Sequence, residues 1–279
     1  MYVDMLNWSA NPWLLNVFFL SIRVAAMLLM TPVLFAASIP LSIRVMLILA
    51  LSVAIASGIA PEHNSTHLIA SGGGALIVAS LRELAFGSSL AVGILIGFAM
   101  ISMAGRLLDV QIGFGMAQVF DPLTRSQLPI VTALFNQLGV IFFFLIDAHH
   151  TLLRAVAFSV EKFPLGQAWS VEGFALPILK HVGSLFSLGF ALASPVVFCL
   201  LLVELSLGVV SRNLPQMNMF VVGVPIKVIV GLATLSVWVA VAGASLTRIH
   251  ASIFQTWDWM FSTASPVAVL PYQRGGANV

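Results

Sequence analysis

Two charged residues lie in apolar segments on either side of one polar turn. Glu204 precedes Pro215 by eleven residues and Lys227 follows it by twelve, within ELSLGVVSRNLPQMNMFVVGVPIK. The Asn and Pro residues between positions 211 and 218 predict a chain reversal, and hence a helical hairpin. At about 1.5 Å per residue, both charges lie roughly 17 Å from the turn. Their matched depth favours an interhelical ion pair; the alternatives are snorkelling or a partner in another subunit.

A third charge, Arg23, interrupts the apolar run Pro12–Leu34. An arginine near the middle of a lipid-facing helix is costly, so we expect it to face a partner helix, a carboxylate or a watery space. One hypothesis places Arg23, Glu204 and Lys227 in a single substrate or proton site of a secondary transporter. A purely structural membrane scaffold is a further alternative.

The cluster Asp147-Ala148-His149-His150 contains residue types that bind metals. Adjacent histidines point to different faces of a helix, and no further ligand recurs nearby. We therefore expect these residues to mark a boundary between apolar and wet environments, and we predict no metal site and no cofactor.

Catalytic signatures are missing from the chain. The sequence has no GxxxxGK[ST] loop, GxGxxG after a strand, HExxH helix or GxSxG elbow. Asp109 and Asp121 are the nearest acidic pair for intramembrane proteolysis, but they lie in an expected loop. We predict no catalytic residue and no enzyme. The 12 basic and 10 acidic residues are thinly spread, which argues against nucleic acid, and the single Cys199 excludes an intrachain disulfide.

The elements that must position these residues are apolar helices. Of the 279 residues, 60% are hydrophobic and 8% are charged, against roughly 45–50% and 25% in soluble domains. We predict an all-α, membrane-associated protein of six or seven hydrophobic helices, since a span needs about 20 residues. The N-terminus carries Asp4 and no cation before Arg23, so we expect no cleaved leader. The charge-free runs are Val45–Pro61, His63–Leu81, Leu84–Gly105, Ser126–Ile146, His181–Val203 and Val228–Thr247.

Local signals divide these runs. Arg82-Glu83 predicts a polar boundary before a helix that contains Gly93 and Gly97. That glycine pair favours close helix packing, either within the chain or against another subunit. The segment Leu246–Ser265, with its tryptophans, predicts an amphipathic helix at a water boundary. The tail 266–279 is expected to be disordered.

Residues 105–129, GRLLDVQIGFGMAQVFDPLTRSQLP, mix glycine, aromatic residues and methionine with polar residues. We predict a loop here and not a spanning helix, because Gly113 and Gly115 loosen the backbone around Phe114. Phenylalanine and methionine exclude water without binding strongly to what displaces them, which suits a removable seal. The alternative is a re-entrant or interfacial connector that only packs.

The segment LGVVSRNLPQMNMFVVGVPIK resembles the hairpin signature of the FliR family of flagellar export-gate proteins and their injectisome relatives. The shared pattern is a turn close to N-x-x-P-Q-x-N followed by Gly-x-Pro, an apolar residue and Lys. QIGFGMAQVFDP is similar to the central loop of that family. Length and hydropathy fit nearly the whole chain, except the tail beyond about Ser265, and the VVGVPIK ending favours the flagellar branch.

This resemblance implies a subunit of the bacterial inner-membrane protein export channel in the flagellar basal body. It implies one copy assembled with about five FliP and about four FliQ subunits, next to FlhB and membrane lipid, with unfolded flagellar proteins as cargo. It also implies a FliP-like portion, residues 1–170, joined to a FliQ-like hairpin, residues 171–265. Much of the hydrophobic surface would then face sister subunits.

The resemblance also implies roles for two groups of residues. The loop at about 106–122 matches a pore plug, in which Phe114, Met116 and Phe120 are the sealing candidates. The turn matches a hairpin tip at the cytoplasmic entrance, where Gln216 helps to constrict the passage. The plug positions are Arg106, Gln111, Gly113, Phe114, Gly115, Met116 and Phe120, and the tip positions are Arg212, Pro215, Gln216 and Asn218.

Overall fold

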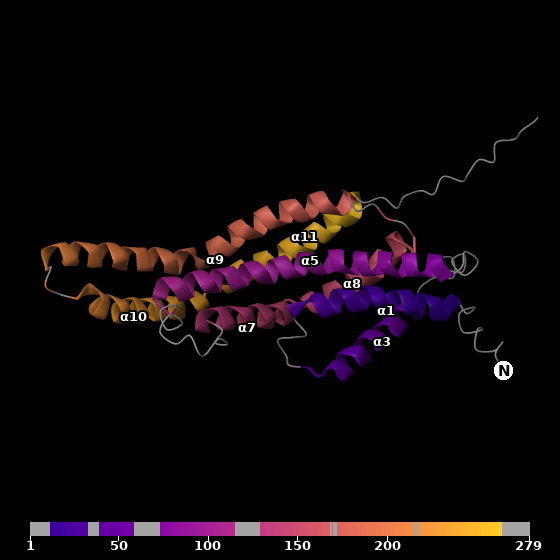
Figure 1. Cartoon of the computed structure of the whole chain (residues 1–279), viewed down its shortest axis with the longest axis horizontal. Coiled ribbons are helices and arrows are strands. Elements are labelled where there is room, and N and C mark those ends of the chain that lie inside the picture. Colours follow the sequence, from indigo (N-terminus) through magenta and orange to yellow (C-terminus); the bar gives the residue numbers. More distant parts are fainter. Residues whose placement is uncertain are drawn as a thin grey trace, which may run out of the picture.

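The computed structural model describes residues 12–32, 39–58, 73–114, 129–167, 169, 172–214, 216 and 218–263. Their architecture is all-α, as predicted, and Figure 1 shows the helices lying roughly side by side along one long axis. The helices are α1 (Pro12–Met30), α3 (Leu41–Ser57), α5 (Gly73–Ile112), α7 (Ile130–Leu145), α8 (Ala148–Lys162), α9 (Glu172–Asn213), α10 (Met219–Val239) and α11 (Gly243–Thr263).

The described residues form eight helices, whereas six or seven hydrophobic helices were expected, because hydropathy alone misplaces several helix ends. Helix α5 has 40 residues and passes through Arg82-Glu83, so the predicted polar boundary there is wrong. The charge-free run Val228–Thr247 is broken, because α10 ends at Val239 and α11 begins at Gly243. Among the residues that the structure describes, four helices are long and apolar enough to cross a membrane, or five if the bent pair α7 and α8 forms one span.

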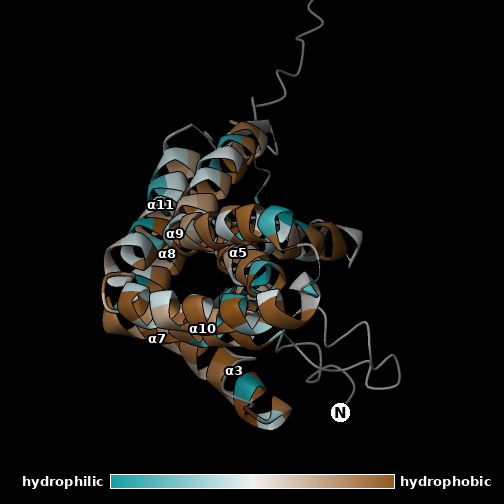
Figure 2. Cartoon of the chain, turned by 90° about the vertical axis from the view of Figure 1, so that its left-hand side faces the viewer, coloured by the Kyte–Doolittle hydropathy of each residue, from teal (hydrophilic) through white to brown (hydrophobic). Residues whose placement is uncertain are grey.

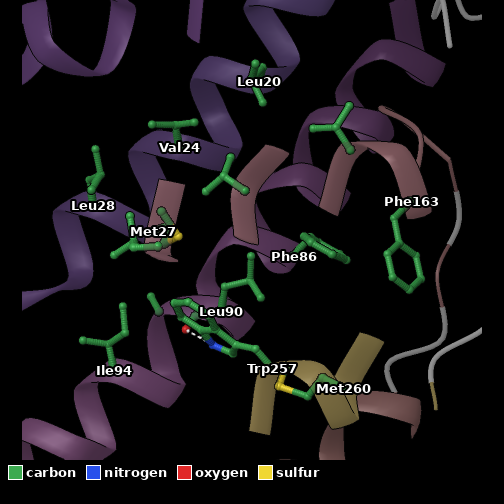
Figure 3. Packing of buried hydrophobic residues seen from close by; sticks show 14 of the residues in the cluster. Leu20, Val24, Met27, Leu28, Phe86, Leu90, Ile94, Phe163, Trp257 and Met260 are labelled. Carbon is green, nitrogen blue, oxygen red and sulfur yellow. Dashed lines mark hydrogen bonds between the residues drawn. The ribbon is translucent and has the colours of Figure 1, made fainter. Parts of the chain in front are cut away.

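Two clusters of buried side chains hold the helices together. The first joins α1, α5, α8 and α11 with parts of α3, α7 and α9, and Figure 3 shows Phe86 and Leu90 of α5 between α1 and Trp257 of α11. The second joins α5, α7, α9, α10 and α11, with Phe135 stacked on Trp238 at 5.3 Å between ring centroids. Helices α5, α7, α9 and α11 contribute to both clusters. The core is therefore shared across the predicted boundary at residue 170.

The glycine pair of α5 packs within the chain, against α11. A Cβ atom on Gly93 would lie 3.1 Å from Nε1 of Trp257, and one on Gly97 would lie 2.6 Å from Cδ1 of Ile253. The Trp257 indole donates to the Leu90 carbonyl at 3.2 Å and is 2% exposed. Helix α11 has one buried and one exposed face, as predicted for an amphipathic helix over Leu246–Ser265, and Trp257 lies on the buried face because the glycines open a groove for its indole.

Helices α9 and α10 form the predicted hairpin, which extends to the left-hand end of the molecule in Figure 1. Their most apolar stretches are only 28% and 22% buried, against 50% in α1 and α5. Hydrophobic residues, coloured brown in Figure 2, also reach the outer surface of α3. Such extensive exposed apolar surface needs a lipid or protein partner.

Candidate functional site

The predicted loop is shorter than expected, because α5 continues to Ile112. Arg106 and Gln111 therefore lie on a helix, the first exposed and the second half-buried, and the prediction that the loop begins at residue 106 is wrong. The helix ends at Gly113, whose φ of 106° is a left-handed conformation that glycine adopts without strain. No proline lies between residues 73 and 112, so no proline ends the helix before the predicted loop.

Phe114 follows this glycine and packs against the second core cluster while remaining half-buried. A Cβ atom on Gly113 would lie 3.7 Å from a methyl group of Val224, so the start of the loop lies next to α10. The loop therefore begins close to the helical hairpin. Gly115, Met116 and Phe120 lie outside the described residues.

Asp109 joins the two ends of the loop. Its side chain is 2% exposed and accepts hydrogen bonds from the Val131 and Thr132 amides, both at 2.9 Å, and from the Thr132 hydroxyl at 2.7 Å. These amides belong to the first turn of α7, where a carboxylate satisfies unpaired donors and the positive end of the helix dipole. The end of α5 is thereby fixed to the start of α7, with residues 113–129 between them.

Sequence reasoning missed this role of Asp109, although a signal was present. Helix α7 starts after Pro129, which makes no side-chain capping bond, and its first turn contains no acidic residue. A helix start without a local cap requires a capping group from elsewhere in the fold. Gly105 permits the contact, since a Cβ atom there would lie 2.6 Å from Cα of Thr132.

The charges of the hairpin form the expected pair. Lys227 Nζ of α10 donates to Glu204 Oε1 of α9, and the two side chains are 25% and 39% exposed. At the tip, Arg212 lies in the last turn of α9 and is exposed, as are Gln216 and Asn218. Pro215 lies outside the described residues.

Arg23 meets a carboxylate, which was one of its three expected environments. Its guanidinium donates to Glu83 at 2.6 and 3.1 Å, and both side chains are 2% exposed. Further bonds reach the Ser159 hydroxyl at 3.0 Å and the Phe163 carbonyl at 3.2 Å, while the Gly166 amide donates to Glu83 at 2.7 Å. Sequence reasoning treated Glu83 as a boundary residue and did not identify it as the carboxylate that pairs with Arg23.

The three charges of the apolar segments, Arg23, Glu204 and Lys227, belong to two separate pairs. Arg23 is on α1 and pairs with α5, whereas Glu204 and Lys227 pair with each other on the hairpin. Helix α10 lies at the left of Figure 1 and α1 in its right half. The geometry therefore does not unite Arg23, Glu204 and Lys227 in one binding site.

Two histidines are buried near α11. His181 of α9 lies 2.6 Å from the Thr256 hydroxyl and 3.3 Å from the Gly93 carbonyl. His250 is fully buried, with Nδ1 2.8 Å from the Leu246 carbonyl. Burial lowers the pKa of His250 below its usual value, and the bond to Leu246 only partly opposes this. A neutral imidazole is therefore the favoured form at this position.

The elbow between α7 and α8 contains Asp147, His149 and His150. The expectation that the two adjacent imidazoles point apart is wrong, since their ring centroids are 4.1 Å apart. Potential ligand atoms of the three residues all lie within 4.8 Å of one another. The left-handed backbone of Asp147, with φ of 54°, interrupts the helix between α7 and α8 and changes the directions of the following side chains.

Comparison with known proteins shows to which family the chain belongs. A model described as bacterial export proteins, family 1, matches residues 14–253. The chain is 34% identical over 182 residues to flagellar biosynthetic protein FliR of Bacillus subtilis (strain 168), covering 62% of this chain and 70% of that protein. It is 25% identical over 253 residues to FliR of Escherichia coli (strain K12), covering 90% and 95%.

A secretion protein is also similar. The chain is 27% identical over 157 residues to secretion system apparatus protein SsaT of Salmonella typhimurium, covering 55% of this chain and 60% of that protein. Both flagellar and secretion-system proteins are thus among its relatives.

Proposed function

Because this chain belongs to family 1 of the bacterial export proteins and is a FliR-family subunit of a flagellar or type III export apparatus, we propose that it forms and seals an inner-membrane export channel with FliP and FliQ. Residues 113–122 act as the removable plug, and exported unfolded proteins displace them. The apparatus is flagellar, in line with the FliR relatives.

The Asp109 contact carries this proposal. A plug must move without unfolding the wall that bears it, so its two ends need fixed attachments. Asp109 supplies one by joining α5 to the first turn of α7, and the left-handed Gly113 lets the chain leave the helix abruptly. Phe114 then offers an apolar ring next to the hairpin.

The exposed hairpin supports assembly with other subunits. Helices α9 and α10 bury little of their apolar surface within the chain, and the Glu204–Lys227 pair keeps them together. FliP and FliQ subunits cover these faces, with residues 171–265 acting as the FliQ-like portion and residues 1–170 as the FliP-like portion. The exposed Arg212 and Gln216 at the tip then lie at the cytoplasmic entrance beside FlhB.

The plug is tested by deleting Gly113–Phe120 in cells that assemble the complex. We expect normal co-purification of the complex and increased ion leakage through the membrane. A triple change of Phe114, Met116 and Phe120 to Ala should also leak, because it removes apolar side chains at constant loop length. Gln118→Ala is the matched control and should not leak. Unchanged conductance in the deletion variant would contradict the plug.

The composition of the native complex tests the channel itself. We expect one copy of this chain to co-purify with several FliP and FliQ chains. Purified protein that is reconstituted alone and moves a small solute would instead support a secondary transporter. A complex in which no loop change alters conductance would support a structural scaffold.

A further inference from the structure

The elbow between α7 and α8 brings together three metal-binding side chains, Asp147, His149 and His150, here called the elbow cluster. The two helices are bent by 68° at this point. Asp147 has φ of 54° and ψ of 29°, a left-handed backbone that is uncommon for a residue other than glycine. Such conformations cost free energy and often occur at functional positions.

The Asp147 carboxylate is not used as a helix cap. Aspartate before a helix normally accepts a hydrogen bond from an amide of the first turn. Asp147 directly precedes α8 but makes no such side-chain bond. Its Oδ1 atom lies 3.6 Å from Nδ1 of His150, and the side chains of Asp147 and His150 are 73% and 63% exposed. The carboxylate oxygens are therefore available to another ligand.

His149 also has an unused nitrogen. Its Nδ1 atom is buried and has no hydrogen-bond partner among the described residues. The ring is held between Phe144, at 5.3 Å between centroids, and His150, at 4.1 Å. A buried imidazole nitrogen without a partner is unfavourable, and binding a metal ion satisfies it.

We propose that the elbow cluster binds one divalent transition-metal ion, with Zn²⁺ as the preferred ion. Two imidazoles and one carboxylate form a common ligand set for zinc, which leaves a fourth position for water. Zinc bonds of about 2.1 Å place neighbouring ligand atoms about 3.4 Å apart in a tetrahedron. The observed separations reach 4.8 Å, so closing the site requires side-chain rotations at an exposed elbow.

The surrounding charges are compatible with a cation. Helix α7 ends at Leu145, two residues before Asp147, and the carboxyl end of a helix attracts positive charge. The amino end of α8 acts in the opposite sense, and the Asp147 carboxylate compensates for it. Calcium and magnesium favour oxygen ligands, so two imidazoles select zinc and similar ions over them.

Equilibrium dialysis against Zn²⁺ tests the site directly. The full chain is purified in detergent with a tag that contains no histidine, and bound zinc is measured by elemental analysis. We expect about one zinc per chain. His149→Ala with His150→Ala should weaken binding at least about tenfold, and Asp147→Asn should weaken it by a similar factor, because asparagine tolerates the left-handed backbone but lacks the charge.

The matched control replaces two other histidines, His63→Ala with His67→Ala, and should retain the zinc affinity of the original chain. Substituting Co²⁺ gives a second measurement, since tetrahedral cobalt absorbs visible light. We expect this absorption in the original chain and in the control, and its loss in the elbow double variant. The proposal is overturned if the original chain takes up less than half an equivalent of zinc, or if the elbow variants bind as tightly as the original chain.

Discussion

Replacing Asp109 should detach the start of α7 from the end of α5. Asp109→Ala removes the acceptor of three hydrogen bonds, two from amides at 2.9 Å and one from a hydroxyl at 2.7 Å. A hydrogen bond to a charged group contributes about 1.5–3 kcal/mol, and the bonds within one network are not additive. Because the alanine variant leaves these donors buried without an acceptor, we expect it to lose about 3–5 kcal/mol of unfolding free energy.

Asp109→Asn separates charge from hydrogen bonding. The amide oxygen still accepts a bond from the first turn of α7, but the interaction with the helix dipole is lost and one donor loses its acceptor. We expect a smaller loss of about 1–2 kcal/mol. The main expectation is therefore that the unfolding free energy is highest for the original chain, lower for the asparagine variant and lowest for the alanine variant.

Denaturant unfolding of the purified full chain in detergent measures these differences, with tryptophan fluorescence as the signal. Asp258→Ala is the control, because Asp258 is exposed and should change the unfolding free energy by less than about 0.5 kcal/mol. An alanine variant at position 109 within about 1 kcal/mol of the original chain would refute the reasoning. If Asp109 also fixes a plug, the same variant should leak ions in cells.

Three further predictions concern separate contacts. Exchanging the Glu204 and Lys227 charges together should restore assembly that each single reversal impairs, measured by co-purification; no recovery would indicate separate partners. Gly105→Ala should cost about 1–3 kcal/mol of unfolding free energy because its Cβ atom would meet the α7 backbone, whereas Gly183→Ala, with open space around it, should be neutral or stabilising in the same assay. Unfolding free energy should fall as the pH drops below about 6.5, because the unfolded chain then binds a proton that the buried His250 resists. His250→Leu should reduce this slope, and an unchanged slope would assign it to other groups.

The features predicted correctly from sequence were those encoded locally. The helical hairpin followed from a turn sequence and apolar flanks, and the Glu204–Lys227 pair followed from counting residues outward from that turn. The all-α class followed from composition. Each of these depends on residues that are close in sequence or matched by a simple geometry.

The features missed depend on contacts between distant segments. Glu83 resembled a water boundary, yet it is buried because Arg23, 60 residues earlier, neutralises it. Asp109 resembled a loop residue, yet it caps a helix that begins 21 positions later. Hydropathy cannot separate a charge that meets water from one that meets an opposite charge in the core. For this reason the start of the loop was placed too early.

The great length of α5 and α9, with 40 and 42 residues, affects the fate of a newly made chain. At about 1.5 Å per residue each helix is about 60 Å long, twice the thickness of bilayer hydrocarbon. An upright orientation would leave about half of each rod outside the lipid tails, and much of α9 there would expose leucine and phenylalanine to water. Cellular proteases should therefore degrade a chain that lacks partner subunits. As a result, the abundance of the chain should follow the number of assembling complexes.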